Sequence, residues 1–276
     1  MSTSRPVSTT HLRAGGGASA TQESLGPLAN LIGTWMGTGF SLIALPVFGG
    51  PPFRLQVNAT TEAFTFTPIS APIPDRGSVQ ADIFYTGLTY VQNVADATTR
   101  AALHVENGMW LNVPATTDPN SPATVVRQSV IPHGDSLLAQ GTSLVVHGGP
   151  TIAPVSPLPT GPGVDQAYTT PYRTGPFPPG FNAQNPNAAL QSAIEGQNII
   201  QTIVLPVSTA PSGGILNIPF VTTNANASQL DAIFWIETVK EASGATFVQL
   251  QYTQTIILNF EGIQWPHITL ATLLKQ

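Results

Sequence analysis

Along most of the chain, apolar and polar side chains alternate with a period of two, which is typical of β-strands with one buried face. Residues 245–260 show this most clearly, because an apolar set and an uncharged polar set lie on opposite faces. The apolar set is expected to point into the core. By this pattern the predicted strands cover residues 34–44, 54–67, 79–93, 100–113, 124–131, 136–147, 199–208, 214–222, 231–241, 245–260 and 267–275.

Turn-forming residues separate these strands, for example at 49–52 (Gly-Gly-Pro-Pro) and at 243–244 (Ser-Gly). About ten strands joined by short turns favour a meander, and closing a meander into a barrel removes its exposed edges. We therefore predict an all-β fold, a closed antiparallel up-and-down β-barrel of about ten strands.

The N-terminal region departs from the period of two. Ser24 is expected to cap a short helix that has Pro27 in its first turn and ends at Gly33. Leucines at 25, 28 and 31 lie on one side of this helix and suit an apolar plug at the edge of the core. Residues 1–23 are rich in Ser, Thr, Gly and Ala and are predicted to form a flexible tail, so the single domain spans 24–276.

A long Pro-rich loop insertion at residues 148–198, called the Pro-rich segment below, also breaks the pattern. One short helix is predicted at 187–196, with Asn187 as its cap. Loops of this length are usually functional or disordered. Because aromatic side chains are scattered through the segment, we expect a lid or a contact between subunits of a homo-oligomer. An ordered surface wrap without a function is the alternative.

Composition excludes several classes of protein. Charged residues make up 8% of the chain, the net charge is −5, and no basic patch is visible, which argues against nucleic acid as a partner. The absence of cysteine excludes disulfides and thiolate chemistry. No run of eighteen apolar residues predicts a membrane span. Without an apolar signal segment near the N-terminus, a cytoplasmic location is the default expectation.

Common catalytic motifs are missing, including a P-loop, a His-Glu-x-x-His helix and a Gly-x-Ser-x-Gly elbow. A metal site formed by the histidines at 104, 133 and 147 is conceivable in a barrel, but no pair has ligand spacing. Ser136, His133 and Asp135 are too close in sequence to converge as a catalytic triad.

The last predicted strand opens with His267, directly after a proline that suits a strand's first position. His267, Thr269, Ala271 and Leu273 share one face of this strand. A histidine with small and apolar neighbours is a candidate metal or heme ligand. A half-buried histidine that hydrogen-bonds a carbonyl is the alternative.

Four segments together resemble the nitrobindin-type heme-binding β-barrels, a calycin-like family. The first has the pattern Gly-x-Trp-x-Gly-x-Gly after a short apolar helix, and the second has the pattern His-x-Glu-x-Gly-aromatic. A Pro-x-Gly segment before an apolar strand and the terminal histidine strand complete the set, so the matching segments are 25–39, 103–110, 131–141 and 266–275. The Pro-rich segment lies outside the resemblance.

The resemblance implies that His267 is the proximal ligand of heme b and that Trp35, Gly37, Gly39 and His133 contact this cofactor. Glycine at positions 37 and 39 lets the backbone approach a flat ligand or a neighbouring helix closely. Members of the family react with nitric oxide and are credited with isomerising peroxynitrite to nitrate. An enzyme of this kind is therefore one hypothesis.

Other residues keep two interpretations. The tryptophans at 35, 110, 235 and 265 either line a pocket or pack in the core, and Glu106 is expected to pair across strands. His104 and His133 are either polar groups of the pocket or structural histidines with satisfied hydrogen bonds. Candidate partners for the heme propionates are Arg54, Arg127 and Lys275. Two further functions remain open: a carrier of an apolar small molecule such as a fatty acid, terpenoid or pigment, and an assembly protein that uses the Pro-rich segment as its contact.

Overall fold

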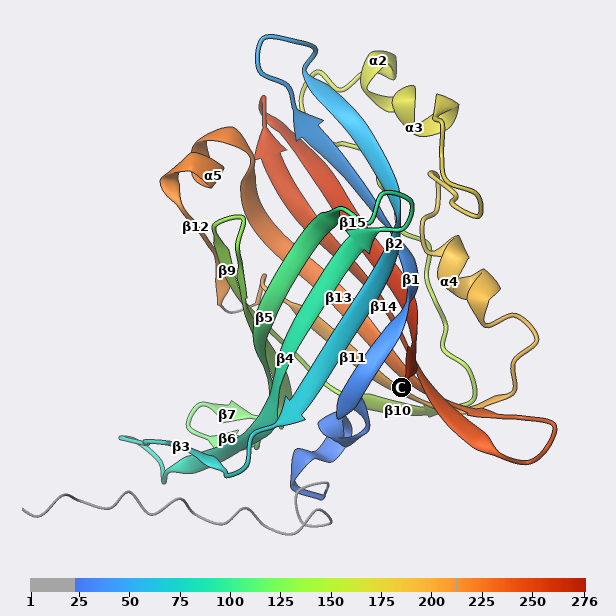
Figure 1. Ribbon diagram of the computed structural model, residues 1–276. Coiled ribbons are helices and arrows are strands. Elements are labelled where there is room, and N and C mark those ends of the chain that lie inside the picture. The colour runs from blue at the N-terminus through green and yellow to red at the C-terminus, as the bar shows by residue number, and fades with distance from the viewer. Residues whose placement is uncertain (1–22, 212) are drawn as a thin grey trace, which may run out of the picture.

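The computed structural model describes residues 23–211 and 213–276, and ten of its strands form a closed antiparallel barrel (Figure 1). Each barrel strand pairs with the next one along the chain, and the last pairs with the first from Trp35↔Lys275 to Leu42↔Ile268. The predicted up-and-down barrel is confirmed. Its strands are β1 (Gly33–Pro46), β2 (Phe53–Pro68), β4 (Ile83–Asp96), β5 (Ala102–Val113), β8 (Thr124–Ile131), β9 (Asp135–Gly141), β11 (Ile199–Ser208), β13 (Asn226–Lys240), β14 (Thr246–Phe260) and β15 (Ile263–Lys275).

Short elements decorate this barrel. Edge strands β10 and β12 pair with β11 and β9, while β3 pairs with β4, and β6 pairs with β7. The remaining elements are η1 (Gly26–Leu31), β3 (Ile73–Asp75), β6 (Thr116–Thr117), β7 (Asn120–Ser121), β10 (Leu144–His147), α2 (Gln166–Thr169), α3 (Pro171–Thr174), α4 (Ala188–Ala193), β12 (Gly214–Asn217) and α5 (Pro219–Asn224).

Several predicted strand boundaries are wrong. The strands predicted at 79–93 and 231–241 span Ile83–Asp96 and Asn226–Lys240. The stretch 136–147 is divided between β9 and β10. The strand predicted at 214–222 stops at Asn217. Pro219 begins helix α5 instead, because the first N–H groups of a helix have no partner within the helix, so proline loses no hydrogen bond there. The last strand begins at Ile263 rather than at His267. It tolerates Pro266 because its pairing with β1 begins only at Ile268, which leaves one edge of the strand free at the proline.

One end of the barrel is filled by a hydrophobic core. The leucines of the N-terminal helical turn, Leu25, Leu28 and Leu31, are buried against Trp35 and the inward side chains of the barrel. The Trp35 indole N–H donates to the Leu31 carbonyl oxygen at 2.7 Å, which fixes the turn to the first strand. Burial of each leucine contributes about 1.5–3 kcal/mol. The predicted helical plug therefore closes this end of the barrel.

The Pro-rich segment lies along the outside of the barrel (Figure 1). Its Ile152 and Leu190 pack with Trp235, Ile268 and Leu270, which point outward from β13 and β15. The predicted helix near 187–196 is present as α4, but its cap residue Asn187 donates its side-chain N–H to the Ala153 carbonyl oxygen instead of capping the helix. The segment is thus an ordered wrap on its own barrel. A contact between subunits through it stays a prediction.

Strand β14 has the two faces that its sequence predicts. The apolar set, with Leu250 and Tyr252, lies in the interior. The polar set lies outward beneath the Pro-rich segment, where Gln251 Nε2 donates to the Leu190 carbonyl oxygen at 3.0 Å and Gln249 Nε2 donates to Gln197 Oε1 at 2.8 Å. Uncharged amides therefore connect the segment to the wall that it covers.

The tail predicted for residues 1–23 lies, apart from Glu23, outside the described residues. Among the residues that the structure describes, no helix has both the length and the apolar character needed to cross a membrane.

Candidate functional site

A cavity of about 1130 Å³ lies in the barrel above the hydrophobic core. The β1–β2 hairpin loop and α5 border its mouth, and both lie at the end of the barrel opposite the N-terminal helical turn (Figure 1). Pockets for small molecules usually have volumes of about 300–1,000 Å³, so the cavity is large enough for a sizeable ligand. Its walls are mostly apolar and include Ile43, Val94, Leu103, Ile131, Leu137, Ile256, Leu258 and Phe260.

His267 faces this cavity from β15, on the same side of the strand as Thr269. The predicted alternation of the strand is confirmed, because Ala271 and Leu273 continue this face into the core. Its Nε2 lies 3.4 Å from Ser41 Oγ on the neighbouring strand β1, which is a long contact for a hydrogen bond. Burial lowers the pKa of His267 to about 3, and His104 and His133 add a smaller effect when they are protonated. The imidazole is therefore neutral and has a lone pair available.

A hydrogen-bonded group, called the floor network below, separates the cavity from the core and consists of Tyr90, Glu106, Arg127 and Gln254. Arg127 Nη2 donates to Glu106 Oε1 at 2.6 Å, Nε donates to Tyr90 Oη at 3.0 Å, and Nη1 donates to Gln254 Oε1 at 3.0 Å. The Tyr90 hydroxyl also donates to Glu106. Burial by itself raises the pKa of Glu106, but the Arg127 charge and the hydrogen bonds from His104 and Tyr90 outweigh it and hold this pKa well below its usual range. Glu106 is therefore an anion.

A second buried carboxyl group, Glu62, lies beside the floor network. It accepts hydrogen bonds from Tyr252 Oη at 2.6 Å, Thr60 Oγ1 at 3.0 Å and Gln92 Nε2 at 3.1 Å. Burial raises the pKa of Glu62, and these hydrogen bonds only partly offset that effect. The cavity thus has one fixed anion below it, and a second carboxyl group that is held toward its neutral form.

Two more histidines line the cavity. The rings of His104 on β5 and His133 in the β8–β9 turn are 5.7 Å apart between centroids. His104 Nε2 lies 3.3 Å from Glu106 Oε2. Asp135 also lines this part of the cavity, and burial raises its pKa more than protonated His133 and His104 would lower it. Titratable side chains therefore border the cavity on β5, β9 and β15 and in the β8–β9 turn.

The predicted cofactor contacts do not all meet. His267 and His133 line the cavity, whereas Trp35 lies in the core next to the N-terminal turn. Gly37 and Gly39 face the backbone of β15, because an added Cβ would lie 2.0 Å from the carbonyl oxygens of Thr272 and Leu270 respectively. Close approach of two strands thus explains these glycines without a ligand.

Other candidates are also distributed through the fold. Trp110 is in the core, Trp235 is on the outer wall, and Trp265 packs with Phe260 beside the cavity. None of the three proposed propionate partners places an unpaired positive charge in the cavity. Arg127 is paired with Glu106, and neither Arg54 nor Lys275 is among the lining residues. His147 lies on the exposed edge strand β10, away from the other two members of the conceivable three-histidine site. Within residues 23–211 and 213–276, no group of three or more side chains of the metal-binding types is close enough to hold a metal ion.

The alternation in β14 predicts an apolar inward face and does not reveal the floor network. Gln254 has the same inward parity as Tyr252, and its side chain lines the cavity. A glutamine at an inward position of an otherwise apolar face is the signal that could have found this network. The expectation that Glu106 pairs across strands is confirmed by its ion pair with Arg127.

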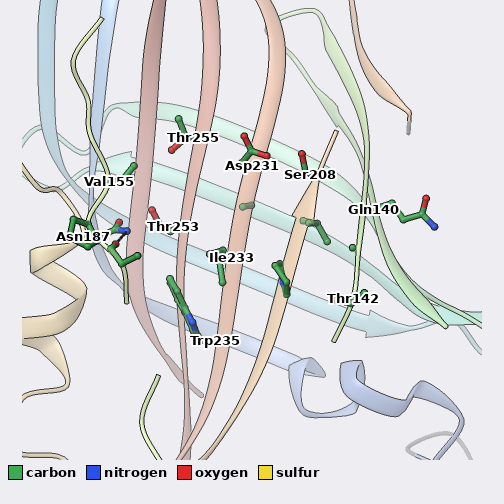
Figure 2. Close-up of a pocket in the computed structure, with 16 residues that line it drawn as sticks. Gln140, Thr142, Val155, Asn187, Ser208, Asp231, Ile233, Trp235, Thr253 and Thr255 are labelled. Carbon is green, nitrogen blue, oxygen red and sulfur yellow. Dashed lines mark hydrogen bonds between the residues drawn. The ribbon is translucent and has the colours of Figure 1, made fainter. Parts of the chain in front are cut away.

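A second pocket, of about 490 Å³, lies outside the barrel between the Pro-rich segment and the wall formed by β11, β13 and β14. Figure 2 shows Asn187 and Val155 on one side of it, Gln140 and Thr142 on the other, and Ile233 between them. Its lining is mostly apolar and has no titratable group except the exposed Asp231. The barrel cavity is therefore the stronger candidate for chemistry.

Together, the fold and the site define a closed ten-stranded β-barrel with a histidine-lined interior cavity. No protein-family model matches the chain, and no curated protein matches it significantly. Among solved structures, the chain is similar to Rv2717c from M. tuberculosis, with 18% sequence identity and a TM-score of 0.48 over 93% of this chain and 97% of that chain. At this identity and TM-score, the function has to be inferred from this chain's own residues.

Proposed function

We propose that the barrel cavity binds heme b through His267, as the resemblance to nitrobindin-type barrels implies. The observation that carries the proposal is a neutral imidazole that faces a cavity of about 1130 Å³. Among the described residues, its side-chain hydrogen-bond contact is a long one, 3.4 Å to Ser41 Oγ. Neutral histidine is a common axial ligand of heme iron. The apolar walls suit the porphyrin ring, and a barrel of this size has room for it.

The residues fit one part of heme better than the other. His267 fits the iron, but no lysine or arginine among the described residues lines the cavity as a partner for the propionates. When bound, heme would supply an iron centre for reactions with small oxidants. The chain itself would hold the imidazole in place, exclude water with its apolar walls and present His104 and His133 to the same cavity.

A hemin titration of the purified protein tests the proposal. We expect a Soret band that shifts and sharpens on binding in the wild type and is lost or strongly altered in His267→Ala. His147→Ala is the matched control, because His147 is exposed on an edge strand and should leave the band unchanged. Absence of a bound Soret band, or the same band in wild type and His267→Ala, would contradict heme ligation by this residue.

The reaction with nitrogen oxides is the finer part of this proposal and is supported only by the resemblance. Stopped-flow mixing of heme-loaded protein with peroxynitrite, followed by measurement of nitrate and nitrite, tests it. Faster decay with an increased share of nitrate, and loss of both effects in His267→Ala, is the expected result. Decay at the rate of buffer would rule out the activity.

A second candidate function is transport of an apolar small molecule, such as a fatty acid, terpenoid or pigment, without heme. The observation that favours it is the exposed Phe48 and Phe220 at the mouth of a mainly apolar cavity. Native mass spectrometry of gently purified protein distinguishes the two functions. A bound lipid-sized mass without heme would favour the carrier.

A further inference from the structure

The inward face of β5 presents a histidine above a buried carboxylate. His104, Glu106 and Trp110 are at alternate positions of this strand, so they point into the barrel. His104 lines the cavity, while Glu106 is buried below it and Trp110 belongs to the core. The inward face of β5 is therefore titratable near the cavity, at His104 and Glu106, and apolar in the core, at Trp110.

Glu106 is fixed in position and in charge. Arg127 Nη2 and the Tyr90 hydroxyl both donate to its Oε1, and Arg127 is itself held by Gln254. Its second oxygen, Oε2, remains for His104 Nε2 at 3.3 Å. A carboxylate that accepts a bond from one ring nitrogen orients the imidazole and stabilises its protonated form. His104 is therefore arranged as the outer member of a carboxylate–imidazole pair.

The free nitrogen of this pair is available to a ligand. Among the described residues, no hydrogen bond to His104 Nδ1 is present, and the ring borders the cavity. The charged and titratable groups that face His104 are Glu106 on its own strand, His133 in the β8–β9 turn, Asp135 on β9, Glu62 on β2 and His267 on β15. Proton exchange at Nδ1 would leave the positive charge next to the Glu106 anion.

We propose that His104, positioned by Glu106, accepts a proton from a ligand in the cavity that combines an apolar ring with a phenolic or enolic hydroxyl. The ligand O–H bond breaks, its electron pair stays on the oxygen, and a new N–H bond forms at Nδ1. The apolar walls suit the ring, and the polar side chains of Gln92, Tyr252 and Gln254 line the same cavity as His104. This proposal uses the cavity of the proposed function but does not require iron.

The probe for this proposal is 4-nitrophenol, whose phenolate absorbs in the visible range. The protein is expressed without added heme, and the spectrum of the protein alone is subtracted. We expect the bound probe to stay ionised at a pH at least one unit lower than the free probe, which is a tenfold change in its ionisation equilibrium. His104→Gln should abolish this shift, whereas the control His147→Gln, on the exposed edge strand β10, should retain it.

Nitrogen-15 NMR of the wild-type imidazoles is an independent measurement that needs no variant. The hydrogen of neutral His104 should be on Nε2, which faces Glu106, and addition of 4-nitrophenol should convert the ring to imidazolium. Failure of the probe to bind, an unchanged shift in His104→Gln, or a hydrogen on Nδ1 of the free protein would each overturn the proposal. Heme binding can succeed while these tests fail, and these tests can succeed without heme, so the two proposals are separable.

Discussion

Glu237 allows a quantitative prediction about stability and pH. It lies on the outward face of β13, fully buried beside the Pro-rich segment, and accepts a hydrogen bond from Gln249 Nε2. Its other oxygen, Oε1, has no hydrogen-bond partner among the described residues. Burial raises the pKa of Glu237 from 4.5 to about 7, and the Gln249 bond opposes this only in part. The folded protein therefore prefers the neutral carboxyl.

The direction of the pH effect follows from this preference. A carboxyl group with a higher pKa in the folded state binds more protons there, so its contribution to stability is complete below pH 4.5 and is lost as the pH rises through about 7. One pKa unit corresponds to about 1.36 kcal/mol, which gives a total loss of about 3 kcal/mol once the group is ionised. Most of this loss, about 2–3 kcal/mol, should occur between about pH 5 and pH 8.

Glu237→Gln should remove this pH dependence, because a neutral amide has a similar shape to the protonated carboxyl group and does not ionise. The measurement is urea unfolding of wild type and variant at several pH values from 5 to 8. The variant should gain stability relative to wild type as the pH rises, and the exposed Glu241→Gln serves as the control. A constant difference between wild type and Glu237→Gln across this range would refute the reasoning.

Three further predictions concern the barrel interior, each measured by denaturant unfolding. Arg127→Met should destabilise by about 3–5 kcal/mol, because it leaves Glu106 buried and unpaired, and the double variant with Glu106→Gln should recover much of this loss. Gly37→Ala should destabilise by more than about 1 kcal/mol, since its Cβ would lie 2.0 Å from a carbonyl oxygen of β15; an unchanged midpoint would contradict this close approach. Leu28→Ala should lower the free energy of unfolding by about 2–5 kcal/mol, because the buried Leu28 helps to close the barrel. Little or no loss would contradict this role of the N-terminal turn.

The barrel itself could be predicted because alternation is a local property. In β15, the inward set of His267, Thr269, Ala271 and Leu273 follows from parity alone, and the structure places these residues on the interior face. The boundaries were less predictable because they depend on neighbours. Pro266 lies within its strand only because pairing with β1 starts two residues later, and no local pattern contains that information.

The polar floor could not be predicted from the sequence for a similar reason. Its members come from strands far apart in the chain, such that Arg127 and Gln254 are 127 positions apart. The sequence predicts Arg127 only as a partner for propionates, because sequence alone does not show that a single arginine is enclosed by Glu106 and Tyr90. Parity indicated which side chains point inward, but it did not indicate which of them reach one another across the barrel.

The floor network also explains why an open cavity coexists with a well-packed core. If the inward side chains of all ten strands were apolar, filling the interior would lower the free energy of the barrel. The buried Glu106–Arg127 pair acts differently, because it is stable only while its hydrogen bonds are satisfied. Tyr90 and Gln254 accept hydrogen bonds from two different nitrogens of Arg127 and so hold its guanidinium in place. Collapse of the cavity walls onto the floor network would disturb a fully bonded ion pair, so the network preserves the space that a ligand can occupy.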